Sequence, residues 1–473
     1  MKHLTAVLVL WCLCSTASAA IPATAVWEVR PTTGSNLNGG GYDSALTGVG
    51  SSVDCSQTGT ILSFTDLTAA ASSTLTDSSA QFTAAHVGNA IHLESASVGT
   101  PGYYFITVFT DASTVTIDRS TTITTGVGKL CGPTKSFNGQ TTTTLAASLV
   151  GGNIVYVKNE AWNEAVTLSA SGTSSSSILV EGYNTTRGDA PTGTSRPTNA
   201  RALAGAVAMT ISGAFYQVNH LVVSAAGTNG WNFSGGNIVL WNVRATACGL
   251  AGFLSPGGNV TLLQCEADLN GSIGVSVTTA VGTVLYGCYV HNNVTSGVNT
   301  SNNGYVGIYN SIVTGNTSHG ISVSAGAPVL HVIGNTINCN SSTGSCGAST
   351  VDGVNMAAGL VFNAGSIFLN NIFSNNGRYG VNKVTPVGVN TNLWLDYNNY
   401  FGNGTAARNN VPVGPHDLAL DPSYANAAAG NYAIGTSLRA KGYPGLFPAA
   451  LTTGFRDIGA VQSPGEVLFH VFP

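Results

Sequence analysis

The chain has 473 residues, of which 43% are hydrophobic and 8% are charged, whereas about 25% of residues are charged in an average soluble protein. Its formal net charge is −4 and it has no basic stripe, which argues against nucleic acid or an anionic membrane surface as a partner. Disorder is excluded too, because disordered chains are highly charged and poor in β-branched residues.

The first twenty residues predict a signal peptide. A polar start at residues 2–3 precedes an apolar stretch at residues 4–13, and Ala17 and Ala19 fit a cleavage site. The apolar stretch is shorter than the roughly 20 residues that a membrane-spanning helix needs. We therefore expect residues 1–19 to be removed and the mature protein to be secreted, extracellular or at the cell surface, without a membrane span.

Residues 20–147 do not share the repeat of the later chain. They contain a glycine run at residues 39–41 and Thr-rich segments that read as strands. We predict a small β-rich domain that caps the N-terminal end of the repeats, because an uncovered end would expose unpaired strand edges. Cys55 and Cys131 could form a disulfide within it.

A short phrase recurs from about residue 207 onward, with a period near 22 residues. One marker of the phrase is an Asn or Cys after an apolar run, at Asn242, Cys265, Cys288, Asn310, Asn335, Asn371 and Asn399. The other is a Gly before the next apolar run, at Gly230, Gly252, Gly274, Gly297, Gly320, Gly353 and Gly380. The short segments between turns are β-branched, which indicates several strands per repeat. We predict an all-β fold, a parallel β-helix over residues 148–410.

Stacking of successive coils gives each marker a physical role, because equivalent residues then form columns. Asn side chains can hydrogen-bond up and down such a column. Cys265 and Cys288 are expected to be free thiols packed in the core. The Gly residues are expected to supply bends with positive φ.

Two phrases carry a resemblance to a known family. The phrases "YNSIVTGNTSHGISV" (309–323) and "NNIFSNNGRYGV" (370–381) resemble the coils of pectin-lyase-like right-handed β-helix proteins. The stretch 151–184 resembles their entry coils, and "RDIGAVQ" (456–462) resembles the ending of many secreted members. The resemblance implies the fold but not the function, since this fold occurs in lyases, hydrolases, epimerases, tailspikes, adhesins and inert surface proteins.

Residues 411–473 are rich in Ala, Pro and Gly and are predicted to be an irregular tail that packs on the last coils. The apolar segment 467–473 is either a last docked strand or a strand for a partner, which would allow self-association through the tail. Cys339 and Cys346 flank a flexible loop and are predicted to form a disulfide in an exported protein.

Acidic residues are scarce in the repeats. Between residues 207 and 350 only Glu266 and Asp268 are acidic, and Arg244 is the only Lys or Arg. Calcium sites of pectate lyases need clustered carboxylates, and a polyanionic substrate needs a basic groove. We therefore predict no cofactor, and calcium has no support from the sequence.

The Gly register nevertheless suggests a candidate catalytic site. His319 and Asp352 precede successive Gly markers and should be neighbours, with Arg378 beside them. Such a pair can act as a general base with its orienting partner. The alternative is a structural hydrogen bond, which is the commoner use of such pairs. Gathering of the three residues in a groove would favour an enzyme, and buried positions would favour a binding or structural role.

A second column holds Asp268 and His291, with Asn338 two coils further on. His220 and His331 lie among apolar residues and are interpreted as strand residues with satisfied hydrogen bonds.

Aromatic residues on the outer face could stack against sugar rings, and Tyr379 and Trp394 are the candidates for carbohydrate binding.

The first hypothesis is thus a secreted protein that binds a polysaccharide or cell-surface glycan, or that builds an extracellular structure. The alternatives are a polysaccharide lyase or glycoside hydrolase using His319, Asp352 and Arg378, and a phage-type tailspike or adhesin.

Overall fold

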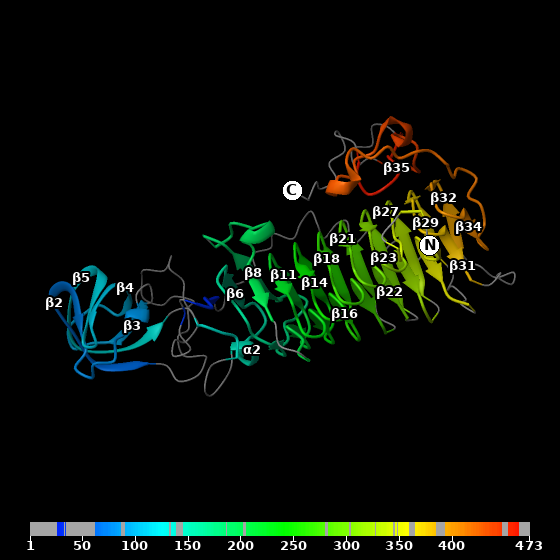
Figure 1. Cartoon of the computed structure of the whole chain (residues 1–473). Coiled ribbons are helices and arrows are strands. Elements are labelled where there is room, and N and C mark those ends of the chain that lie inside the picture. Colours follow the sequence, from blue (N-terminus) through cyan, green and yellow to red (C-terminus); the bar gives the residue numbers. More distant parts are fainter. Residues whose placement is uncertain are drawn as a thin grey trace.

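The computed structural model describes residues 26–462 except 33, 35–61, 87–89, 132–133, 139–144, 186, 202–204, 280–281, 302–303, 327, 344–345, 348, 359–364, 385–392 and 447–452. Short strands stack into one long solenoid, with a separate sheet near one end and the C-terminal tail along one side (Figure 1). Within these ranges, no helix is long and apolar enough to cross a membrane. The predicted signal peptide lies outside the described residues.

Three sheets run along the solenoid, and every strand pairing within them is parallel. The first sheet contains β1 (Val26–Val29), β6 (Ile154–Lys158), β8 (Ile178–Tyr183), β11 (Tyr216–Asn219), β14 (Ile238–Trp241), β17 (Val260–Leu263), β20 (Thr283–Tyr286), β23 (Tyr305–Tyr309), β26 (Val329–Ile333), β29 (Ser366–Leu369) and β32 (Leu393–Asp396).

The second and third sheets are built from the other strands of each coil. The second contains β9 (Thr198–Ala200), β12 (Val222–Ser224), β15 (Arg244–Thr246), β18 (Glu266–Asp268), β21 (Tyr289–His291), β24 (Ile312–Thr314), β27 (Thr336–Asn338), β30 (Ile372–Ser374) and β33 (Asn399–Phe401). The third contains β7 (Val166–Leu168), β10 (Met209–Ile211), β13 (Trp231–Phe233), β16 (Phe253–Ser255), β19 (Val275–Val277), β22 (Val298–Thr300), β25 (Ile321–Val323), β28 (Val354–Met356), β31 (Tyr379–Lys383) and β34 (Ala406–Asn409). One strand of each sheet per coil confirms the predicted parallel β-helix.

The bend between the first and second sheets uses two positions. The first has positive φ, for example +51° at Asn242 and +47° at Asn310, which Asn tolerates better than most residues. The second points inward and forms the column Val243, Cys265, Cys288, Ser311, Asn335, Asn371 and Asn398, as the hydrogen bonds between neighbours show. The sequence prediction therefore placed the column one residue too early at Asn242 and Asn310, and one residue too late at Asn399.

A second polar column, which the sequence markers did not predict, follows the second sheet. Each Asn in it accepts from the backbone of the preceding coil, and the Asn270, Asn293 and Asn316 amides also bond one another at 2.8–2.9 Å. Its members are Cys248, Asn270, Asn293, Asn316, Asn340, Asn376 and Asn403. Both columns satisfy buried amides at the bends, where no strand ladder can do so.

The repeated glycines have a different role from the predicted one. None of the seven Gly markers is among the glycines with positive φ. At Gly274, a Cβ would lie 2.7 Å from the carbonyl oxygen of Gly297 and 2.8 Å from Nδ2 of Asn293. Glycine is needed because adjacent coils approach too closely for a side chain.

The solenoid core consists mainly of Val, Ile, Leu and Phe from the inner faces of all three sheets. Aromatic rings stack along the third sheet, with ring centroids 6.2 Å apart for Trp231 and Phe233. Cys265 and Cys288 are buried and unpaired as predicted, and burial raises the pKa of the Cys265 thiol. Phe137 and α2 (Leu145–Ser148) pack into the same core near its N-terminal end.

The N-terminal sheet is antiparallel and has its own core. It contains β2 (Ser63–Thr76), β3 (Ala90–Ser95), β4 (Gly102–Asp111) and β5 (Thr114–Cys131), with the short helix η1 (Ala84–His86). By contrast β1, which falls within the predicted domain 20–147, pairs with β6 and extends the solenoid. The capping role and the domain boundaries stay predictions, and Cys55 lies outside the described residues.

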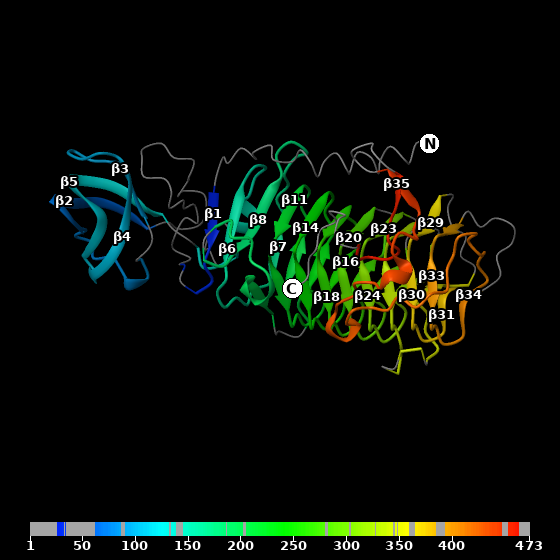
Figure 2. The same ribbon diagram turned by 90° about the horizontal axis from the view of Figure 1, so that it is seen from above.

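The C-terminal tail folds back over the second sheet (Figure 2). It contains η3 (Ala427–Ala429), η4 (Thr436–Leu438), β35 (Pro444–Leu446) and β36 (Thr453–Phe455). Its Ile434, Leu438 and Ile458 pack against Ile372 of β30. The phenol of Tyr432 bonds Thr314 Oγ1 of β24 at 2.9 Å, and other tail residues bond β27 and β33. The segment 467–473 lies outside the described residues.

Candidate functional site

The tail divides the outer face of the second sheet into two halves. We call the face of β24, β27, β30 and β33 the covered half, and that of β12, β15, β18 and β21 the open half. Gly430, at the edge of the tail, lies beside the Tyr289 hydroxyl and marks the border. The open half carries two outward columns, Arg244, Glu266, Tyr289 and Thr246, Asp268, His291.

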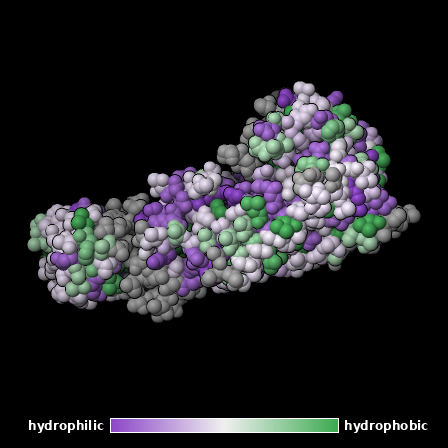
Figure 3. Space-filling model, viewed as in Figure 1, coloured by the Kyte–Doolittle hydropathy of each residue, from purple (hydrophilic) through white to green (hydrophobic). Residues whose placement is uncertain are grey.

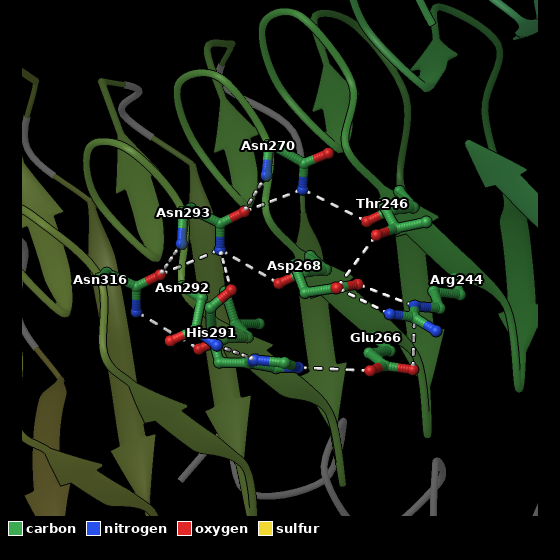
Figure 4. A network of polar contacts seen from close by, with 12 residues as sticks. Arg244, Thr246, Glu266, Asp268, Asn270, His291, Asn292, Asn293 and Asn316 are labelled. Atoms are coloured by element: carbon green, nitrogen blue, oxygen red, sulfur yellow. Dashed lines mark hydrogen bonds and ion pairs between the residues drawn. The ribbon is translucent and has the colours of Figure 1, made fainter. Parts of the chain in front are cut away.

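A bidentate ion pair lies at the centre of the open half (Figure 4). Arg244 donates from Nε to Asp268 Oδ1 at 2.8 Å and from Nη2 to Oδ2 at 2.7 Å. Thr246 Oγ1 donates to the same Oδ2 at 3.0 Å. The Asp268 side chain is 1% exposed and that of Arg244 is 30% exposed. The hydrogen bonds to Asp268 raise the pKa of Arg244 against the opposing effect of burial.

Glu266 is held by three basic groups. His291 Nε2 lies 3.2 Å from Oε1, while Arg244 Nε and Arg196 Nη2 lie 3.4 and 3.6 Å from Oε2. Burial acts to raise the pKa of Glu266, but the hydrogen bond from His291 and the charges of the two arginines together lower it. Glu266 is thus an ionised, compensated carboxylate.

The imidazole of His291 is fixed on both nitrogens. Asn292 Nδ2 lies 3.0 Å from Nδ1 and donates to it, so the neutral ring carries its proton on Nε2, which faces Glu266. The Tyr289 ring stacks on the imidazole with centroids 3.9 Å apart and an interplanar angle of 23°. The pair forms a rigid planar surface.

The open half lies between two walls. Arg196, which follows η2 (Gly193–Ser195) in the loop after β8, stands on one side, and the tail stands on the other. Hydrophilic residues gather on the surface between the loop and the tail (Figure 3).

Three of these side chains could also be considered as metal ligands. Ligand atoms of Glu266, Asp268 and His291 lie within 4.8 Å of one another. Both oxygens of Asp268, however, already accept from Arg244. A cation would have to displace this guanidinium, so the donor set fits an arginine better than a metal.

The predicted residues His319, Asp352 and Arg378 do lie together, at the turn that leads into the third sheet. Arg378 donates from Nε to Asp352 Oδ1 at 2.9 Å and from Nη2 to Oδ2 at 2.7 Å. The backbone N–H of Tyr379 also donates to Oδ1, and Asn382 Nδ2 donates to Oδ2. Asp352 is fully buried, with hydrogen bonds on both oxygens.

His319 meets the backbone of Asp352 rather than its carboxylate. Its Nδ1 accepts from the Asp352 N–H at 2.9 Å and is 3.7 Å from Oδ2. The proton of the neutral ring is therefore on Nε2, and burial lowers the pKa of the imidazole. A general base oriented by a carboxylate would need the opposite tautomer.

The two residues predicted to bind carbohydrate lie on different sheets. Tyr379 is on the third sheet, with the Arg378 guanidinium 5.0 Å from its ring centre. Trp394 is on the first sheet, 46% exposed, with its ring edge-on to Tyr443. Cys339 and Cys346 form a disulfide with Cα atoms 4.6 Å apart.

The two histidines interpreted as satisfied strand residues differ. His331 lies on β26 and bonds the phenols of Tyr305 and Tyr309 and the carbonyl of Gly365, as expected. His220 instead occupies a bend with φ of +55°, and its buried Nε2 has no hydrogen-bond partner among the described residues. The interpretation is wrong for His220, because the bend turns its ring toward the first sheet.

Sequence reasoning placed Asp268 beside His291, which the strand register confirms. It missed Arg196, because this residue lies in a loop outside the repeat and its position depends on how that loop folds onto the coils. Tyr289 and His291 lie two residues apart on β21, so strand alternation places both on the outer face.

A family profile described as the right handed beta helix region matches residues 205–356 and again 253–406. These matched residues lie within the parallel β-helix that the structure shows. A search of curated protein sequences found no match.

Several solved structures are similar to this β-helix protein. The pectate lyase Pel9A has a TM-score of 0.47 and 14% identity over 67% of this chain and 89% of its own. The periplasmic alginate epimerase AlgG has a TM-score of 0.35 and 12% identity over 57% and 74%. The A-module of the Azotobacter vinelandii mannuronan C-5 epimerase AlgE6 has a TM-score of 0.33 and 17% identity over 56% and 88%.

Proposed function

We propose that the protein is secreted and binds an extracellular polysaccharide or cell-surface glycan on the open half, without cleaving it. The surface offers guanidinium, amide and carboxylate groups in fixed positions beside the stacked ring of Tyr289. Sugar hydroxyls both donate and accept hydrogen bonds, and the C–H faces of sugar rings pack on aromatic rings. Such planar polar groups match a glycan chain.

The observation that carries the proposal is that the carboxylates are already paired. Each oxygen of Glu266, Asp268 and Asp352 faces a donor or a cation at 3.6 Å or less. A catalytic acid or base must instead have its proton-transfer atom available to the substrate. Paired groups are held rigid before a ligand arrives, which reduces the entropy lost on binding.

Charge favours a neutral polymer over a polyanion. The ion pairs of Arg196 and Arg244 with Glu266 and Asp268 cancel, with two charges of each sign. No net positive field is left to attract uronate carboxylates.

Affinity electrophoresis through gels that contain neutral or acidic polysaccharides tests the proposal. We expect a neutral polymer to retard the wild-type protein and to retard the Tyr289→Ala variant much less. Equal mobility of the wild type in all gels would contradict the proposed function.

A second candidate is a polysaccharide lyase or glycoside hydrolase, which only the gathering of His319, Asp352 and Arg378 at one turn favours. Incubation with the same polymers would then release reducing ends or unsaturated products, and His319→Ala would abolish this release. A binding protein yields neither product. A phage-type tailspike or adhesin, or self-association through the tail, would show as a mass above that of one chain in light scattering.

A further inference from the structure

A second group of unusual side chains lies around the bend from the open half, on the first sheet. The register places Glu181, Asn219 and Trp241 in one outward column on β8, β11 and β14. His220 follows Asn219 at the bend, and its ring meets the Trp241 ring edge-on with centroids 4.7 Å apart. We call these four residues the corner group.

Hydrogen bonding in the corner group is incomplete, in contrast with the open half. Glu181 Oε2 accepts from Asn219 Nδ2 at 2.6 Å, and Oε1 lies 3.6 Å from His220 Nε2. His220 is 2% exposed; its Nδ1 accepts from Asn242 Nδ2 at 2.9 Å, whereas its Nε2 has no hydrogen-bond partner in the described part of the chain. Buried polar atoms without partners are rare in folded proteins and point to a missing ligand or water.

Glu181 also lacks the arginine that neutralises the other carboxylates. Burial raises its pKa to about 7, and the charge of Asp189 in the loop after β8 adds to this effect. The same loop places Arg196 near His220, whose pKa burial lowers. A carboxyl group therefore faces this corner near its midpoint of ionisation at neutral pH.

Trp241 supplies an accessible flat surface beside these atoms. Trp241 occupies an outward position of β14 and is 39% exposed. The indole Nε1 donates to Gln264 Oε1 at 2.8 Å, which fixes the orientation of the ring. An exposed, immobilised indole next to unsatisfied polar atoms suits the apolar face and adjacent hydroxyls of a sugar.

Arg196 connects the corner group to the open half. Its Nη1 donates to the carbonyl and the side-chain oxygen of Asn242 at 3.1 Å, and its Nη2 lies 3.6 Å from Glu266. Trp241 and Arg244 are only three positions apart on one coil. A single extended ligand could therefore touch both groups.

We propose that Glu181, Asn219, His220 and Trp241 form a second subsite, which binds one uncharged sugar residue of the same polysaccharide where the chain passes round the bend. This inference rests on the proposed function and extends it. The sugar ring stacks on Trp241, and a neighbouring hydroxyl donates to Glu181 Oε1. A uronate is disfavoured because its carboxylate would face Glu181 and Asp189.

The test uses calorimetric titration of the full chain with fragments of the polysaccharide that retards it. We expect Trp241→Ala to weaken binding about tenfold and Trp241→Phe to weaken it only about threefold, since a ring is kept. Thermal melting of each variant checks that the fold is intact. Glu181→Gln supplies a variant that leaves the aromatic platform unchanged.

The pH profile tests the carboxyl group separately. Hydroxyl donors stabilise the ionised form of Glu181, so wild-type affinity should rise as the pH passes through about 7. Glu181→Gln should remove this rise. A flat wild-type profile, or one that Glu181→Gln leaves unchanged, would contradict the role of the carboxyl group.

The outcomes separate the inference from the proposed function. Wild-type affinity in Trp241→Ala combined with weakened binding in Tyr289→Ala overturns the second subsite and leaves the open half as the binding surface. Absence of binding by the wild type overturns both. Weakened binding in Trp241→Ala and Tyr289→Ala supports one continuous surface.

Discussion

The open and covered halves of the second sheet share one backbone but carry different side chains. In the covered half the two outward columns hold Ile312, Thr336, Ile372 and Thr314, Asn338, Ser374, all uncharged. In the open half the same columns hold two acids, an arginine and a histidine. The coil geometry is the same in both, so only side-chain chemistry distinguishes the docking surface of the tail from the surface that we propose for a ligand.

The difference follows from the cost of burying charge. A tail docked over Arg244 and Glu266 would remove both charges from water, whereas Ile372 gains from contact with Leu438 and Ile458. Within the described residues, the tail reaches the Tyr289 hydroxyl, where the ionic residues begin. Three substitutions can break or sharpen this comparison, and a fourth tests Glu181 on the first sheet.

The largest effect is expected in the covered half, from Leu438→Ala. Leu438 is fully buried between the tail and β30, and its truncation should cost about 3 kcal/mol and release the tail. Limited proteolysis should then cut within residues 411–462, while urea unfolding reports the loss of stability. Leu420→Ala is the matched control, because Leu420 is 39% exposed and should change stability by less than about 0.5 kcal/mol. Unchanged proteolysis of Leu438→Ala would contradict the docked tail.

In the open half, Arg244→Ala should destabilise the protein by roughly 2 kcal/mol, because it leaves the buried carboxylate of Asp268 unpaired. Adding Asp268→Ala should recover part of this loss, since no buried charge then remains. Urea unfolding of the single and double variants measures the loss of stability and its partial recovery. An equal or greater loss in the double variant would show that the ion pair is not the reason for the effect.

Glu181→Gln should be stabilising at alkaline pH. Burial raises the pKa of Glu181 from 4.5 to about 7, so the folded state binds the proton more tightly than the unfolded state. The wild type therefore loses stability as the pH rises from 4.5 through 7, and at pH 8 the variant should be more stable by roughly 2 kcal/mol. Melting temperatures at pH 5 and 8 check this, with a difference expected only at pH 8. A gain of the same size at pH 5 would be inconsistent with ionisation of this group.

The smallest effect is expected from Tyr432→Phe in the covered half. It removes the hydrogen bond to Thr314 and should cost about 1 kcal/mol without changing polysaccharide affinity. Tyr424→Phe, which loses the bond to Ser374, is the matched comparison. A loss of polysaccharide binding in either variant would place the ligand under the tail instead of beside it.

The fold could be predicted because each repeat leaves a local trace in the sequence. Cys265, Cys288, Asn335 and Asn371 fall in one column because the inner position of the bend repeats once per coil. The one-residue error at Asn242 and Asn310 arose because Asn suits both the positive-φ position and the column that follows it.

The candidate site could be predicted only in part. The register brings Asp268 and His291 together, and it also brings His319, Asp352 and Arg378 together. The register does not reveal that Asp352 is buried with both oxygens hydrogen-bonded, because one of the donors, Asn382, comes from the next coil. Arg196 and the border at Tyr289 depend on a loop and a tail that follow no period.

The binding surface itself can be tested by titrating the retarding polysaccharide into the wild type, Tyr289→Ala and Trp394→Ala, each checked by thermal melting. Trp394 is exposed on the first sheet and is the alternative position predicted from the sequence. We predict that Tyr289→Ala weakens binding at least about tenfold and that Trp394→Ala binds as the wild type does. Unchanged binding in Tyr289→Ala with loss of binding in Trp394→Ala would contradict a ligand on the open half.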